Sequence, residues 1–111
     1  MLVVDEHRTM GSSPEILGQL KSTILRDRNH PCFILWSLGN EEHAIQGMDV
    51  GARIAATMAR LVGRLDPTRP VTLATNGDWG SQVSQIMDVQ GCNYVVCGGA
   101  TSSTLTLQIS P

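Results

Sequence analysis

Four groups of polar side chains could do chemistry in this 111-residue sequence, and each follows a short apolar run. They occupy residues 5–8, 40–43, 75–78 and 93–94. Glu41 is the strongest candidate among them for acid/base chemistry. Gly39 lets the backbone turn sharply before it, and the apolar residues ahead of that glycine place the Glu41 carboxyl beside a wall that favours its protonated form. A carboxyl in such surroundings can act as a general acid near neutral pH.

Spacing alone leaves more ordinary roles open for these residues. A glutamate after a strand is commonly a helix cap, a salt-bridge partner or a solvated loop residue, and all three roles remain open for Glu41. Glu42 is interpreted as a solvated residue. Asp5 is expected either to support the site or to cap the loop that follows it. His7 and His43 are predicted to be exposed loop histidines, with contact to a substrate or positioning of a loop as the alternative.

Short apolar runs and helical periodicity predict the elements that position these groups. Strands are expected at residues 2–4, 32–38, 71–74 and 89–94, and helices at 14–28, 50–65 and, as a short turn or two, 81–87. This alternation is typical of right-handed β-α-β units, and it predicts an α/β fold with a parallel sheet. The carboxyl ends of parallel strands meet at one edge of a sheet, so we expect the four polar groups to lie together there.

Two further expectations concern packing and the end of the chain. Trp36 and four methionines are predicted to pack in the interior: Met10, Met48, Met58 and Met87. His30, which precedes Pro31 between a helix and a strand, is expected to have a structural hydrogen-bonding role. Residues 97–111 form a Ser/Thr-rich tail that is not assigned to the sheet, which leaves residues 1–96 as the domain.

Composition excludes several classes of protein. The chain is 41% hydrophobic with a formal net charge of −2, and no apolar run approaches the roughly 20 residues that span a bilayer. Its basic residues are not clustered, so a nucleic-acid partner is not expected. The three cysteines lack zinc-ligand or disulfide spacing, and no metal or cofactor is assigned. The first residues do not resemble a signal peptide, which favours a cytoplasmic location.

Residues 26–41, RDRNHPCFILWSLGNE, closely resemble the signature RDRNHPSVILWSLGNE of glycoside hydrolase family 2, the family of β-galactosidases, β-glucuronidases and β-mannosidases. Three flanking segments also resemble that family: VVDE at 3–6, DPTRP at 66–70 and DVQGCNY at 88–94. The resemblance covers residues 1 to 94. It implies a partial (β/α)8 TIM barrel, about strands three to six of eight, with parallel strands and outer helices.

The same resemblance implies roles for particular residues. Glu41 matches the acid/base of a retaining glycosidase, and Asn40 matches the asparagine that hydrogen-bonds the sugar 2-hydroxyl. Tyr94 matches the tyrosine that contacts the nucleophile. Asp5 is a further candidate for the substrate site, and Trp79 is expected either to stack on a sugar ring or to pack. The implied partner is a β-glycoside, and the full-length enzyme is compatible with a homo-oligomer.

Retaining hydrolysis needs a second carboxylate, and the family's nucleophile lies in a T-E-Y/F-like strand that does not follow Tyr94 here. The chain is therefore expected to be inactive alone. Two alternatives are a non-catalytic carbohydrate-binding or assembly module and a self-contained flavodoxin-like binding module. The latter lacks a Gly-rich phosphate loop. The sequence does not select the sugar, because the loops that set specificity lie outside this segment.

Overall fold

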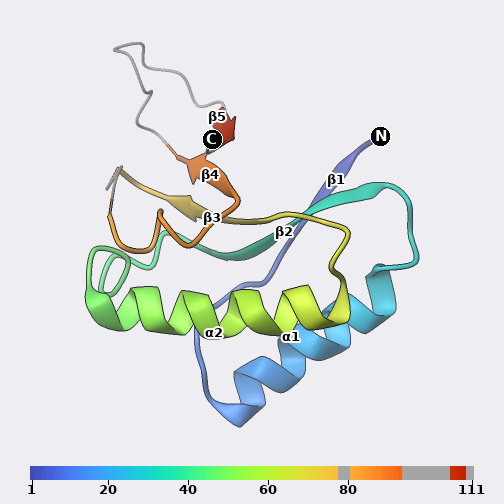
Figure 1. The fold of residues 1–111 in the computed structure, drawn as a ribbon, viewed down its shortest axis with the longest axis horizontal. Helices are drawn as coiled ribbons and strands as arrows, with labels where there is room; N and C mark the ends of the chain where they lie inside the picture. Colours follow the sequence, from blue (N-terminus) through green and yellow to red (C-terminus); the bar gives the residue numbers. More distant parts are fainter. Residues whose placement is uncertain (78–80, 94–105, 110–111) are drawn as a thin grey trace.

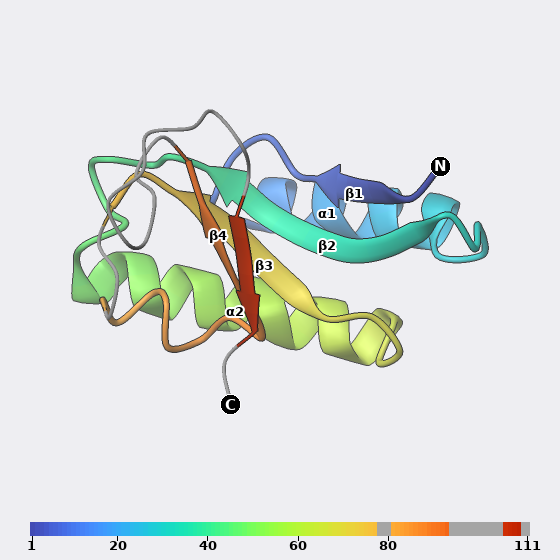
Figure 2. The same cartoon turned by 90° about the horizontal axis from the view of Figure 1, so that it is seen from above.

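The computed structural model describes residues 1–77, 81–93 and 106–109. It contains five strands and two helices in the order β1 (Val3–Glu6), α1 (Pro14–Asp27), β2 (Phe33–Asn40), α2 (Asp49–Leu65), β3 (Val71–Thr75), β4 (Val89–Cys92) and β5 (Thr106–Ile109). The strands form one sheet in sequence order. β1 to β4 pair in parallel, whereas β5 is antiparallel to β4. Both helices cover the same face of the sheet (Figures 1 and 2).

The predicted α/β fold with parallel strands is confirmed, with element ends that shift by up to two residues. The prediction of a short helix at 81–87 is wrong, because residues 82–86 form turns. Ser84 explains part of this difference. Its hydroxyl donates to the carbonyl of Ser81 at 2.7 Å, and a serine side chain that takes a backbone acceptor in this way competes with helical bonding.

The tail contributes a strand that was not expected from the sequence. Residues 106–109 pair with β4, with Ile109 opposite Val89 and Thr106 opposite Cys92. The apolar alternation of Leu105, Leu107 and Ile109 is a period-2 strand pattern, but the Ser/Thr-rich composition around it obscured the signal. The division of the chain at residue 96 remains a prediction.

Local signals explain where the first helix begins. Ser13 has an extended backbone, and its hydroxyl accepts a hydrogen bond from the Ile16 amide at 3.3 Å. Pro14 follows at the first helical position, where its missing N–H costs nothing. The helix ends at Asp27, three residues ahead of His30 and Pro31. These are the residues that the sequence indicated as start and stop signals.

The core lies between the helices and the helix-covered face of the sheet. It contains buried side chains from both layers: Leu20 and Ile24 from α1, Ala55, Met58 and Val62 from α2, and Trp36, Leu38, Val71 and Leu73 from the strands. Interior packing is confirmed for Trp36, Met10, Met58 and Met87. It is wrong for Met48, which precedes α2 and is 56% exposed.

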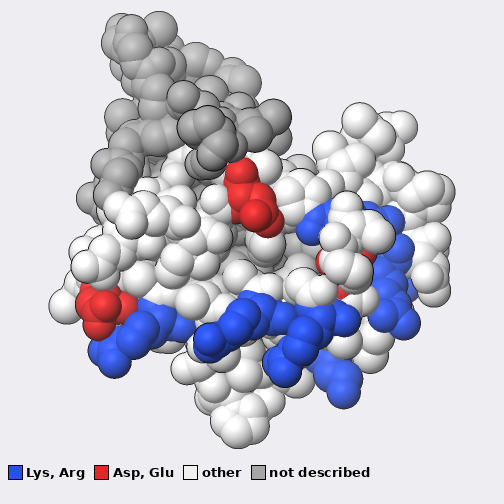
Figure 3. Space-filling model, viewed as in Figure 1, with Lys and Arg blue, Asp and Glu red and all other residues white. Residues whose placement is uncertain are grey.

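The outer surface of α2 is basic. Arg53, Arg60 and Arg64 are exposed along this helix, and Figure 3 shows blue side chains following its length. Arg53 forms an ion pair of 3.0 Å with Asp49 at the helix start. Exposed pairs of this kind contribute little stability, so this surface is a solvated helix face.

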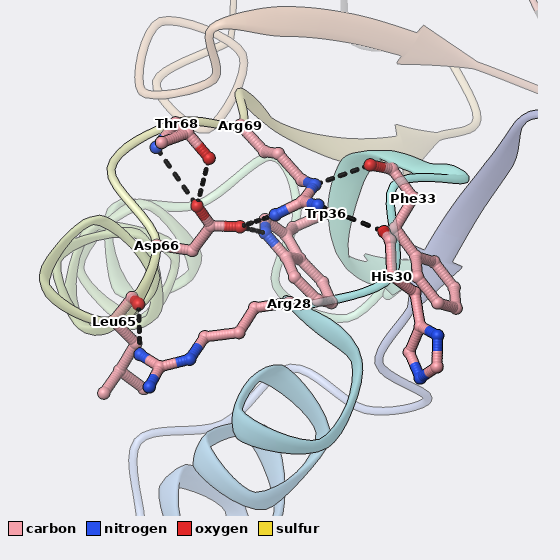
Figure 4. A network of polar contacts seen from close by, with 8 residues as sticks. All are labelled: Arg28, His30, Phe33, Trp36, Leu65, Asp66, Thr68 and Arg69. Atoms are coloured by element: carbon pink, nitrogen blue, oxygen red, sulfur yellow. Dashed lines mark hydrogen bonds and ion pairs between the residues drawn. The ribbon is translucent and has the colours of Figure 1, made fainter.

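A buried carboxylate, Asp66, joins α2 to the sheet at the amino ends of the strands (Figure 4). It accepts hydrogen bonds from the Trp36 indole at 2.9 Å, from the Thr68 amide at 3.1 Å and from Arg69 at 2.5 Å. Burial alone would raise the pKa of Asp66, but the bonds from Thr68, Arg69 and Trp36 outweigh it and lower the pKa to about 2. Asp66 therefore stays ionised although its side chain is buried.

Arg69 extends the same network to the start of β2. It donates to the carbonyls of Phe33 at 2.5 Å and His30 at 3.1 Å. The His30 ring lies edge-on to Phe33, with ring centres 6.0 Å apart. Arg28 donates to the Leu65 carbonyl at 2.8 Å and so ties the end of α1 to the end of α2. The His30 backbone is thus part of this network, whereas a hydrogen-bonding role of its side chain stays a prediction.

Candidate active site at the carboxyl ends of the strands

Glu41 lies immediately after β2 in an unusual backbone conformation. Its φ angle is +46°, in the left-handed region that side chains other than glycine rarely adopt. The Glu41 amide donates to the Ala74 carbonyl at 2.8 Å, and the His43 amide donates to the Glu41 carbonyl at 2.8 Å. These two bonds hold the turn. Such strained residues occur preferentially at functional sites, although strain by itself does not assign a function.

The Glu41 carboxyl is largely enclosed, with its side chain 16% exposed. Its Oε1 is buried and has no hydrogen-bond partner among the described residues. Its Oε2 lies 3.6 Å from Nε2 of His43, whose side chain is 63% exposed. Of the ordinary roles, a solvated loop residue does not fit this burial, whereas the contact with His43 leaves an ion pair open. A buried acceptor without a partner is costly, so Oε1 is available to an incoming hydrogen-bond donor.

Asn40 is the last residue of β2 and pairs in register with Ala74 of β3. Successive residues of a strand face opposite sides of the sheet, and Leu73 faces the core between the sheet and the helices. Ala74 and its partner Asn40 therefore face away from the helices. The Asn40 side-chain oxygen accepts a hydrogen bond from Nδ2 of Asn93 at 2.8 Å. The Asn93 amide in turn donates to the Thr75 carbonyl at 2.8 Å. Asn40, Glu41 and Asn93 are therefore all tied to the end of β3.

Asp5 and Glu6 lie within β1, where the sequence predicted a loop, and they face opposite sides of the sheet. Asp5 pairs with Trp36, a core residue, and its carboxyl lies close enough to that of Asp27, at the end of α1, for the two to interact. Burial and this contact with Asp27 raise the pKa of Asp5. Asp27, which forms an ion pair with Arg26, has a lowered pKa. The structure thus places Asp5 toward the helix layer, beside Asp27, and its role in a substrate site stays a prediction.

Glu6 belongs to the side of the sheet that the helices leave open, and His7 follows it directly after β1. Glu6 accepts a hydrogen bond from the Ser37 hydroxyl at 3.0 Å, and the His7 amide donates to the Ser37 carbonyl at 2.9 Å. His7 was expected to be exposed but is half-buried, and this burial lowers the pKa of its imidazole. His43 is exposed, as predicted.

Glu42 was interpreted as solvated, and this is wrong. It is half-buried, and its Oε1 accepts a hydrogen bond from the Met10 amide at 3.3 Å. This bond ties the loop after β1 to the loop after β2. Glu41 and Glu42 are thus adjacent carboxyls with different surroundings: one has an acceptor oxygen without a described partner, and the other supports a loop.

Some of the expected site residues lie outside the described residues, namely Trp79 and Tyr94. Conversely, the sequence indicated no role for Asn93 beyond its place in a polar strand-end group, and it did not indicate Ser37 at all. Asn93 was recognisable only as a polar residue at the end of a predicted strand, and its contact with Asn40 depends on strand order and register. Ser37 lies inside an apolar run and gave no signal.

Residues 1–77, 81–93 and 106–109 contain no group of three or more His, Cys, Asp or Glu side chains that could hold a metal ion. No helix in these parts is both long and apolar enough to cross a membrane.

Comparisons with known proteins agree on one group of enzymes. The family model described as "Glycosyl hydrolases family 2, TIM barrel domain" matches residues 5–103. A putative β-glucuronidase of Formosa agariphila is 39% identical over 76 residues, which cover 68% of this chain and 6% of that protein. A β-galactosidase of Lactobacillus delbrueckii subsp. bulgaricus is 37% identical over 65 residues, covering 59% of this chain and 6% of that protein.

Among solved structures, a glycosyl hydrolase family 2 member from Bacteroides cellulosilyticus matches with a TM-score of 0.72 and 31% identity. The match covers 85% of this chain and 14% of that one. The chain thus spans a small part of the length of each protein that it resembles. The parallel strands and outer helices of β1 to β4 correspond to a portion of the barrel and not to the whole.

Proposed function

Because the chain belongs to glycosyl hydrolase family 2, as part of its TIM barrel domain, we propose that it carries the acid/base carboxyl of a retaining β-glycosidase and that this group is Glu41. The observation that carries the proposal is the environment of Glu41. It is a largely buried carboxyl, held by a left-handed backbone at the end of β2, with an acceptor oxygen that has no partner among the described residues. Asn40 lies beside it at the strand end, where barrel enzymes bind their substrates.

In the proposed reaction, the protonated Glu41 carboxyl donates its proton to the glycosidic oxygen as the bond to the leaving group breaks. A second carboxylate, about 5–5.5 Å away, attacks the anomeric carbon and forms a covalent glycosyl-enzyme. The Glu41 carboxylate then takes a proton from a water molecule that displaces the enzyme from the sugar. We propose that the second carboxylate lies outside residues 1–94, so that this chain alone does not hydrolyse a glycoside.

The proposed substrate is a β-linked glycoside. Names of the related proteins include both β-glucuronidase and β-galactosidase, which differ in the charge of the sugar that they act on. The described site contains no arginine or lysine contact to Glu41 or Asn40 that would select a sugar carboxylate. The proposal therefore stays at the level of the β-glycosidic bond.

Glu41→Gln in the complete enzyme that carries this segment tests the proposal. Glutamine keeps the shape of the side chain but cannot transfer a proton. We expect kcat/KM for an aryl glycoside with a poor leaving group, such as phenol, to fall by about 100-fold or more. For a dinitrophenyl glycoside, whose leaving group needs no proton, the loss in the first chemical step is expected to be within about tenfold.

Glu42→Gln is the matched control, because a glutamine oxygen can still accept the Met10 amide. It should leave the dependence on the leaving group unchanged. Equal losses for both substrates in Glu41→Gln would show that Glu41 is not the acid. Sugar binding without turnover by the complete protein would favour the non-catalytic binding module instead.

A further inference from the structure

The hydrogen bond between Asn93 and Asn40 joins two strands that are not neighbours in the sheet. Asn40 ends β2 and Asn93 follows β4, and β3 lies between them. The two amides nevertheless meet, with Nδ2 of Asn93 donating to Oδ1 of Asn40 at 2.8 Å. Backbones two strands apart are separated by about 9–10 Å. A contact across this span requires both side chains to lie over the middle strand.

Small residues beneath the contact make this possible. Ala74 of β3 pairs with Asn40 on one side and with Gly91 of β4 on the other. A longer side chain at position 74 would stand between the two amides. The backbones of both partners are also fixed to β3, because the Glu41 amide bonds to the Ala74 carbonyl and the Asn93 amide bonds to the Thr75 carbonyl.

The direction of the bond has a chemical consequence for Asn40. A side-chain amide has an oxygen that only accepts and an NH2 group that only donates. Because the Asn40 oxygen accepts the bond from Asn93, the amide is held with its NH2 group free of this contact. Without Asn93, a rotation of the Asn40 amide by half a turn would exchange the two groups.

We propose that Asn93 is a positioning residue: it orients the Asn40 amide so that its NH2 group donates a hydrogen bond to the substituent at sugar carbon 2. This inference rests on the proposed function, because it requires Asn40 to contact the sugar whose bond Glu41 protonates. Asn93 acts through Asn40 and not on the reacting atoms. It should therefore affect only those substrates that have a hydrogen-bond acceptor at carbon 2.

The test compares Asn93→Ala with the wild-type complete enzyme on two matched aryl glycosides, the ordinary sugar and its 2-deoxy analogue. We expect Asn93→Ala to lower kcat/KM about tenfold for the ordinary sugar, the effect of one well-placed hydrogen bond. The 2-deoxy analogue should be cleaved by both enzymes at rates within about twofold. Equal losses on both substrates would indicate a purely structural role and would overturn the inference.

Asn93→Asp tests the orientation itself and does not depend on the behaviour of the alanine variant. A carboxylate at position 93 can only accept, so it should attract the Asn40 NH2 group and turn its oxygen toward the sugar. Fluorine at carbon 2 can accept a hydrogen bond but cannot donate one. We expect the rate of enzyme glycosylation by a 2-deoxy-2-fluoro glycoside, relative to that by the 2-deoxy glycoside, to fall at least fivefold compared with wild type.

This ratio cancels the effect of the new charge, which acts on both substrates alike. An unchanged ratio would overturn the proposed orientation. Asn29→Ala is the matched control, because it removes an exposed amide before the start of β2, at the opposite end from Asn40. Failure of the inference is also distinguishable from failure of the proposed function. If only the inference about Asn93 fails, the loss of kcat/KM in Glu41→Gln still depends on the leaving group. If the proposed function fails, that loss does not depend on the leaving group.

Discussion

Replacing Asp66 by asparagine should destabilise the chain in a way that depends on pH. The pKa of Asp66 is lowered from 3.8 to about 2 in the folded chain, because its hydrogen bonds from Thr68, Arg69 and Trp36 outweigh the opposing effect of burial. The difference corresponds to about 2 kcal/mol, since one pH unit is worth about 1.4 kcal/mol. Asp66 therefore contributes about 2 kcal/mol to the free energy of unfolding near pH 7 through its ionisation.

The sign follows from the lowered pKa. A group of this kind stabilises the fold fully above its unfolded pKa, and the contribution is lost as the pH falls through the folded value. The contribution of Asp66 should thus decrease to about 1 kcal/mol at pH 3 and almost vanish below pH 2. Asp66→Asn lacks the carboxylate at every pH, so the difference between the two chains should shrink by about 1 kcal/mol between pH 7 and pH 3.

Urea unfolding followed by far-UV circular dichroism, at pH 7, 5, 4 and 3, measures this difference. Asp49→Asn is the matched control, because Asp49 makes an ion pair with Arg53 while its side chain is 67% exposed. Its effect should stay within about 0.5 kcal/mol. A difference for Asp66→Asn that is the same at all four pH values would refute the reasoning, because it would show that the carboxylate charge does not stabilise the network.

Other predictions concern single positions in the two helices. Gly51→Ala should destabilise the chain by more than about 1 kcal/mol, because a Cβ at position 51 would lie 2.0 Å from the Ile45 carbonyl oxygen. In the same helix, a Cβ at Gly63 would meet nothing within 4 Å, so Gly63→Ala should stabilise the chain by up to about 1 kcal/mol. Urea midpoints of the two variants should move in opposite directions, and equal shifts would contradict the local geometry. Ser13→Ala should cost about 1 kcal/mol by removing the acceptor for the Ile16 amide, and a loss below about 0.3 kcal/mol would show that this cap is dispensable.

The sequence allowed the order of β1 to β4 and of both helices to be predicted because these elements have strong local signals. Ser13 and Pro14 start a helix, and the apolar run before Glu41 is long enough to indicate a buried strand. The place of Glu41 at a strand end follows from that run. Its left-handed backbone does not, because that conformation depends on the bond from its amide to Ala74 in another strand.

Two residues of the candidate region have side-chain partners that the sequence did not indicate. Asp5 and Glu42 were judged from their place in polar stretches, but their partners, Asp27 and Met10, come from other elements. The contact of Asn93 with Asn40 depends on which strands flank β3, and no local pattern records that. Local sequence thus predicts which elements form, whereas side-chain partners require the register between them.

The antiparallel strand β5 has a consequence for how the barrel can be completed. It hydrogen-bonds to the edge of β4 that faces away from β3, which is where a barrel would place its next parallel strand. Two strands cannot pair with the same edge of β4, so a next parallel strand of the barrel could not simply be added there. It would have to displace β5. Each hydrogen bond that β5 gives up would be replaced by one from the incoming strand. The driving force for the exchange would therefore have to come from the apolar surface that the new strand buries.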